Sequence, residues 1–212
     1  MGISFVLMSN ITDHLFFKTF IMKKITLILA FATAIFTSCN NGSDTPKDAV
    51  DAAKDNNDKK EDQKTLAVTE DDSKFLVFAA DAGMTEVEAS KLANTQTVGA
   101  KTKEFADMMI KDHSAAGDEV KAIAAAKNVT LPAGISEDHQ KALNDLGTKK
   151  GTDFEKEYIA MMVDDHQKVV DKFKDAAENC KDTDIKGFAA KTLPGMQAHL
   201  DHAKALKDGM KK

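Results

Sequence analysis

Apolar side chains recur at every third or fourth position along most of the chain from Ser73 to Lys212. This spacing is the period of an α-helix that buries one face. Four long segments have it, with apolar stripes over residues 75–93, 98–123, 154–173 and 185–206. Four amphipathic helices joined by short connections bury their stripes most simply as a four-helix bundle. The pattern therefore predicts an all-α domain over residues 73–212.

Capping residues and one proline refine the ends of these helices. Thr97 is predicted to cap the second long helix, and Ser136 to begin a short extra helix that ends at Leu146. Pro194 lies inside the last long segment. Because proline lacks a backbone N–H and disfavours helix at the residue before it, a kink or a break is predicted there. The predicted fold is thus an up-down four-helix bundle with a short extra helix and a break in its last helix.

Residues 22–38 have the parts of a secretory signal. Lys23 and Lys24 come first, an apolar run follows, and small residues precede Cys39. Cys39 resembles the cysteine of bacterial lipoproteins that becomes diacylated and anchors the mature chain. A transmembrane helix is the alternative, but a span needs about 20 apolar residues and this run is shorter. Residues 1–21 are interpreted as an upstream extension, which reflects either a start codon assigned too early or an unusually long first part of the signal.

Residues 39–72 are rich in Asn, Asp, Lys and Ser and nearly devoid of large apolar side chains. Such a segment buries too little apolar surface to offset the entropy lost on ordering. It is therefore predicted to be a flexible tether between a lipidated Cys39 and the helical domain. Lipid, tether and domain together predict a protein anchored to a membrane of the cell envelope.

The composition excludes several common classes of function. The formal net charge is −5, so no basic surface for nucleic acid is expected. All 29 basic residues are lysine, which leaves no guanidinium group for bidentate binding of phosphate. The sequence contains no glycine-rich nucleotide loop, nucleophile elbow or C-x-x-C pair. No catalytic residue is predicted on these grounds, and an enzyme of these classes is not expected.

One acidic or imidazole side chain interrupts the apolar stripe of each long helix. At about 100° per residue, these groups project into or beside the apolar faces. They are Glu86, His113, His166 and His199. A buried charge requires a partner or a ligand, and imidazole and carboxylate bind iron, zinc, manganese and copper. We therefore predict a site for a single transition metal ion at these four residues.

Asp112 and Asp165 each precede one of these histidines in a repeated Asp-His pair. Either carboxylate could join the metal or orient an imidazole from outside. The alternative is a buried polar network in which Glu86 and the histidines bond each other and fix the register of the helices. In that case the protein is a non-catalytic structural or interaction module of the envelope, whose protein partner the sequence does not identify.

The remaining candidates are interpreted as structural. The paired methionines at 108–109 and 161–162 are typical of adaptable core filling, with a copper(I) site as the alternative. Cys180 is predicted to be a free thiol. His139 and His202 are predicted to face solvent.

Several of these motifs occur together in one known family. They are the run from Gly83 to Glu88, Met109 with Asp112-His113, Tyr158 with Met162 and His166, and Leu193-Pro194 with His199-Leu200. With these motifs in order over about residues 73–208, the chain resembles the bacterial family known as domain of unknown function 4142. The resemblance implies a ferritin-like four-helix bundle in an exported protein, often of the outer membrane. It implies no reaction, because the function of the family is uncharacterised.

Ferritin-like proteins often hold two iron ions, with a Glu on two helices and Glu-x-x-His on the other two. In this chain Ile110, Val163 and Met196 stand three residues before the three histidines, where a Glu would be required. A di-iron centre is therefore not expected. A mononuclear site rich in histidine, or no metal site, fits the sequence better.

Overall fold

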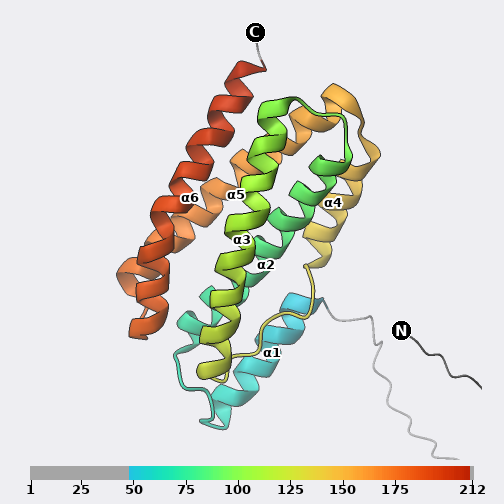
Figure 1. The fold of residues 1–212 in the computed structure, drawn as a ribbon. Coiled ribbons are helices and arrows are strands. Elements are labelled where there is room, and N and C mark those ends of the chain that lie inside the picture. The colour runs from blue at the N-terminus through green and yellow to red at the C-terminus, as the bar shows by residue number, and fades with distance from the viewer. Residues whose placement is uncertain (1–47, 211–212) are drawn as a thin grey trace, which may run out of the picture. The chain divides into compact units, whose positions relative to one another are not determined.

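The computed structural model describes residues 48–210, and every regular element in that range is an α-helix. The helices drawn in Figure 1 are α1 (Ala49–Asp62), α2 (Glu70–Thr95), α3 (Ala100–Ala126), α4 (Glu137–Thr148), α5 (Gly151–Asn179) and α6 (Thr183–Gly209). The prediction of an all-α domain is confirmed. Helices α2, α3, α5 and α6 contain the four predicted stripes, and α4 is the predicted short helix.

Side chains explain where several helices begin. Ser136 accepts a hydrogen bond from the backbone N–H of His139 and caps α4, as predicted. Thr97 does not cap α3, which begins after Gly99. The backbone N–H of Gly99 donates to Oε1 of Glu155 at 2.9 Å. A side chain from α5, which the local sequence does not reveal, therefore satisfies this end of α3.

The flexible tether predicted over residues 39–72 is wrong between Ala49 and Asp62, where the chain forms helix α1. Asn57 on α1 is buried and exchanges two hydrogen bonds with the backbone of Thr130, at 2.9 and 2.7 Å. Thr130 lies in the loop after α3. Helix α1 could not be predicted from the sequence pattern, because it has no apolar stripe and is held by polar contacts to a distant loop.

Two apolar clusters divide the core along the long helices. Along α2 and α6 the chain passes from the first cluster, which contains Phe75 and Phe188, to the second, which contains Ala93 and Ala203. Along α3 and α5 it passes from the second to the first. Because α3 and α5 run in the same direction, the predicted up-down alternation is wrong for this pair (Figure 1). The connection between them returns through α4.

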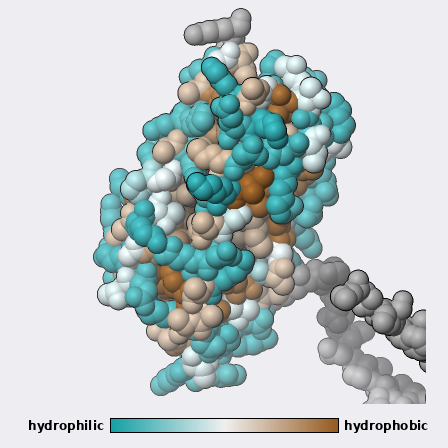
Figure 2. Space-filling model, in the orientation of Figure 1, coloured by the Kyte–Doolittle hydropathy of each residue, from teal (hydrophilic) through white to brown (hydrophobic). Residues whose placement is uncertain are grey.

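The long helices pack as two antiparallel pairs. Helix α2 packs along α3 and α5 along α6, while α2 also contacts α5 and α3 contacts α6. On the face drawn in Figure 2, hydrophilic residues dominate and hydrophobic residues are visible between them. This surface is expected when each helix turns its apolar stripe inward.

Helix α6 is continuous through Pro194, so the predicted break is wrong. Proline removes the one hydrogen bond that its N–H would have donated to the carbonyl of Ala190. Both residues are exposed, so water can reach that carbonyl. Phe188 and Met196, on either side of the proline, are buried in the same apolar cluster and hold both halves of the helix.

No helix within residues 48–210 is both long and apolar enough to cross a membrane. The predicted upstream extension at 1–21, the signal at 22–38 and the lipid-bearing Cys39 lie outside the residues that the structure describes. They therefore stay predictions.

Candidate metal centre

Four buried polar side chains meet in the core, one from each of the helices α2, α3, α5 and α6. Glu86, His113, His166 and His199 have exposed fractions of 1%, 4%, 0% and 4%, in that order. The structure thus brings together all four residues that the sequence analysis predicts as metal ligands.

These residues lie where the two apolar clusters meet. On α3, His113 stands between Met109 of the second cluster and Val120 of the first. Helix α5 has the same order around His166. Apolar packing on both sides lowers the local dielectric constant, and electrostatic contacts are stronger in such an environment than at the surface.

Ring nitrogens from the three histidines converge. Nε2 of His113 lies 3.2 Å from Nδ1 of His199 and 3.3 Å from Nε2 of His166. One nitrogen from each ring lies within 4.8 Å of the other two, as a metal ligand must. Glu86 is not part of this group of three, because its carboxylate approaches the other nitrogen of the rings that it contacts.

Contacts on the outer side of the rings assign the ring protons. Nδ1 of His166 lies 3.0 Å from the carbonyl oxygen of Met162, which only accepts, so Nδ1 carries the hydrogen and Nε2 a lone pair. Nε2 of His199 lies 3.1 Å from Oδ2 of Asp112, which leaves a lone pair on Nδ1. Both lone pairs therefore face Nε2 of His113.

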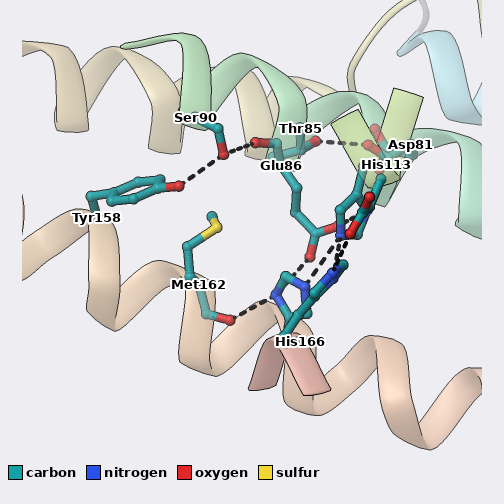
Figure 3. Close-up of polar contacts among 10 residues, drawn as sticks. Asp81, Thr85, Glu86, Ser90, His113, Tyr158, Met162 and His166 are labelled. Carbon is teal, nitrogen blue, oxygen red and sulfur yellow. Dashed lines mark hydrogen bonds and ion pairs between the residues drawn. The ribbon is translucent and has the colours of Figure 1, made fainter. Parts of the chain in front are cut away.

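The carboxylate of Glu86 completes this assignment. Its Oε2 lies 3.0 Å from Nδ1 of His113 and its Oε1 lies 3.2 Å from Nδ1 of His166. When His113 is neutral, an anion at Nδ1 holds the hydrogen there and leaves the lone pair on Nε2. Neither contact is aligned well enough to count as a hydrogen bond, so the carboxylate is held by charge attraction to the two rings. Figure 3 shows the Glu86 side chain extending from its helix toward the two rings.

Electrostatics favour the protonation states that bind a metal. Burial alone raises the pKa of Glu86, but attraction to His113 and His166 outweighs it, and the pKa lies below its ordinary value. Burial lowers the pKa of His166. Burial, followed by the charge of His113, lowers the pKa of His199 to about 4. At neutral pH Glu86 is thus an anion, and His166 and His199 are neutral, the form in which imidazole binds a metal.

The two aspartates that precede histidines differ in position. The Asp112 carboxylate reaches His199 and fits the predicted orienting role. The Asp165 carboxylate pairs with Nζ of Lys168 at 3.0 Å, and burial raises its pKa. The structure therefore supports an orienting role for Asp112 and gives Asp165 a lysine partner on its own helix.

A buried hydroxyl pair, which the sequence analysis missed, fastens the turn that carries Glu86. The hydroxyl of Tyr158 lies 2.8 Å from Oγ of Ser90, and Ser90 donates to the backbone carbonyl of Glu86 at 2.7 Å (Figure 3). The hydroxyl of Tyr158 thus donates to Ser90. The presence of Tyr158 in a family motif was the one available signal, since Ser90 lies 68 positions away.

A second missed pair involves His139, whose predicted exposure is wrong. His139 is half-buried, and its Nδ1 lies 2.9 Å from Oδ2 of Asp81 on α2. No local pattern reveals this pair, because it depends on how α4 docks against α2. His202 is exposed, as predicted, and its ring packs edge-on to Phe105.

Comparison with known proteins identifies one related family. A family model described as "Domain of unknown function (DUF4142)" matches residues 57–206, a range that contains all four site residues. No curated protein and no solved structure matches the chain.

Proposed function

This chain belongs to the family described as Domain of unknown function (DUF4142), and we propose that it binds one transition metal ion at His113, His166 and His199. The observation that carries the proposal is the convergence of one nitrogen from each ring, with a carbonyl or carboxylate oxygen beside the other nitrogen of each ring. Such outer acceptors are the usual way in which proteins fix the tautomer of a metal-binding histidine.

The spacing of the nitrogens agrees with this role. At a metal–nitrogen bond of about 2.0–2.1 Å, two ligands of a tetrahedral ion lie about 3.4 Å apart. The two shortest separations here are 3.2 and 3.3 Å. Small movements of the rings would therefore place an ion between them.

Three histidines favour a mononuclear centre with a free coordination position. Iron, zinc, manganese and copper are the candidates. Imidazole is a preferred ligand of iron, zinc and copper, whereas manganese prefers oxygen ligands. Asp112 would orient His199, and the Glu86 carboxylate would balance part of the positive charge of the ion. No carboxylate stands three residues before any of the histidines, so a di-iron reaction is not proposed.

We also propose that the bundle is ferritin-like. Two antiparallel helix pairs joined by one long crossover are the arrangement of ferritin-like folds. The order of α2, α3, α5 and α6, with α4 in the crossover, supports this assignment. A ligand or metal site in the core of such a bundle is common.

Metal content tests the function directly. The mature chain, refolded with iron, zinc, manganese or copper and freed of excess metal, is expected to retain about one equivalent of one of them. His166→Ala should abolish retention, and His202→Ala, which removes an exposed histidine, should not. Less than about 0.2 equivalents of every metal in the wild-type chain would contradict the proposal.

A polar network without metal is the competing function, because the contacts among the three rings also meet hydrogen-bond geometry. In that case His113→Ala would lower the free energy of unfolding by about 1–3 kcal/mol, since it strands buried partners. The loss would be the same with added zinc and with a chelator. A loss that grows when zinc is added supports the metal site instead.

We further propose that the chain is held in the bacterial envelope, at the outer membrane, by lipid on Cys39. The signal pattern at 22–38 and the cysteine that follows it support this proposal. Mass spectrometry of the N-terminal peptide from membranes is expected to show a diacylated Cys39. Cys39→Ser should release the protein into the soluble fraction, and a wild-type chain already found there would contradict the anchor.

A further inference from the structure

A small cavity lies beside the Glu86 carboxylate. It has a volume of about 20 Å³ and is lined by Glu86, His113 and mostly apolar residues, among them Phe173, Phe188 and Met196. A space of this size holds one water molecule or one ion. Its lining includes Glu86 and His113 but neither His166 nor His199.

Glu86 places a negative charge in the wall of this otherwise mostly apolar cavity. Its two oxygens are buried, and they approach Nδ1 of His113 at 3.0 Å and Nδ1 of His166 at 3.2 Å without an aligned hydrogen bond. An ionised carboxylate in such a place is costly unless a cation or a hydrogen-bond donor approaches it. A divalent metal ion is a suitable partner, because carboxylate oxygen is one of its common ligands.

Two glycines line both the cavity and a groove on the surface of the bundle. A groove of about 700 Å³ runs over α2, α3 and the loop before α4, where Leu131 and Ile135 form part of its wall. Gly83, His113 and Gly117 line both the groove and the cavity. The wall between them is therefore thinnest at these residues.

Neither glycine is required by packing. A Cβ added at Gly83 or Gly117 would meet no atom within 4 Å. Glycine inside a helix costs about 0.5–1 kcal/mol relative to alanine. Both positions thus accept that cost while leaving open space between the groove and the site.

The other acids that line the groove already have lysine partners. Glu88 pairs with Lys91 at 2.7 Å, and Asp118 pairs with Lys121 at 3.0 Å. Among the acids that line the groove and the cavity, Glu86 is the one without a lysine partner. A cation that comes from the groove therefore meets at Glu86 the first carboxylate that has no lysine partner.

We propose that the cavity is a loading site for a divalent cation, which passes between Gly83 and Gly117, binds Glu86 first and then moves to the three histidines. This inference rests on the proposed function, since it needs the histidine site to hold the metal. The inference adds a second cation position at Glu86 and a route to the histidines. Rates of metal uptake test both of these separately from the amount of metal bound at equilibrium.

The test measures the rate of loading with cobalt(II) chloride, whose visible absorption changes when histidine nitrogens bind it. Gly83→Val and Gly117→Val fill the opening and are expected to slow loading about tenfold or more, a barrier increase of about 1.4 kcal/mol. Both valine variants should still bind one equivalent of cobalt once loading is complete. Glu86→Gln should also slow loading. Gly187→Val is the matched control, since Gly187 is a helical glycine on α6 with equally open surroundings and lines neither space.

Wild-type rates in both valine variants would overturn the route, and a wild-type rate in Glu86→Gln would overturn the loading role of Glu86. If a valine variant does not fold, as judged by circular dichroism, the alanine variants decide. Gly83→Ala and Gly117→Ala favour helix and should slow loading to a smaller extent, and unchanged rates in both overturn the route. A wild-type chain that takes up no cobalt contradicts the proposed function itself, which is a different result.

Discussion

Asp112 and His199 lie on different helices, yet Oδ2 of Asp112 lies 3.1 Å from Nε2 of His199. Asp165 precedes His166 on α5 just as Asp112 precedes His113 on α3. The Asp165 carboxylate, however, lies 3.0 Å from Nζ of Lys168 on its own helix. Two aspartates that look equivalent in the sequence therefore have different partners. Only Asp112 is placed to direct the lone pair of a ring toward the centre.

Asp112→Asn is expected to weaken zinc binding by about 10- to 100-fold, the usual effect of removing an outer partner of a metal-binding histidine. Asp165→Asn is the matched control and should leave the Kd unchanged. Competition with a chromophoric chelator measures both values. Equal effects of the two substitutions would contradict the orienting role of Asp112.

Zinc is expected to stabilise the folded chain, because the three nitrogens converge only there. At a free concentration 100-fold above its Kd, the free energy of unfolding should rise by about 2.7 kcal/mol. For a domain of this size that corresponds to an increase in Tm of about 5–10 °C. Circular dichroism melts with zinc and with a chelator measure the difference. His166→Ala should lose this increase and His202→Ala should keep it, whereas an undiminished increase in His166→Ala would place the zinc elsewhere.

The four site residues could be found from the sequence because each is a local anomaly. A glutamate or histidine at helical spacing within an apolar stripe, such as Glu86 between Ala82 and Ala89, marks an inward polar group without knowledge of the fold. Their convergence follows once the four stripes pack together. The sequence could not tell that Glu86 contacts Nδ1 of the rings, since this depends on the rotamers that the packing selects.

The parts of the fold that were missed depend on contacts between distant segments. Helix α1 is held by polar bonds from Asn57 to Thr130, and the direction of α5 depends on α4 crossing back between it and α3. Neither the polar bonds of α1 nor the direction of α5 is encoded in a periodic apolar pattern. The same holds for the pair of Asp81 and His139, which join α2 and α4.

The Asp81–His139 pair is expected to make stability depend on pH. The contact of Nδ1 of His139 with the Asp81 carboxylate raises the pKa of His139 above 6.5. This contribution is fully present below the unfolded pKa and is lost as pH rises through the folded pKa. Burial alone raises the pKa of Asp81, but His139 and the backbone N–H of Ser136 bring it below 3.8, so its contribution is lost only as pH falls through that lower value.

The pair therefore stabilises most between about pH 4 and 6.5. His139→Gln should lower the free energy of unfolding by on the order of 1 kcal/mol at pH 5.5 and by less at pH 9. Urea unfolding at both values measures the change, and His202→Gln serves as the exposed control. A loss that is larger at pH 9 would contradict the assigned ion pair.

Cys180, a free cysteine as predicted, is expected to be a poorly reactive thiol. Burial, followed by the hydrogen bond to Asp72, raises its pKa to about 12. Because the thiolate is the reactive form, a Cys39→Ser chain at pH 8 should react with an aromatic disulfide reagent at least about 100-fold more slowly when folded than in urea. Asp72→Asn should speed the reaction of the folded chain, since it removes the charge beside the thiol, and Asp71→Asn at the exposed neighbouring position should not. A folded wild-type chain that reacts at the rate of the unfolded one would contradict the burial of the thiol beside Asp72.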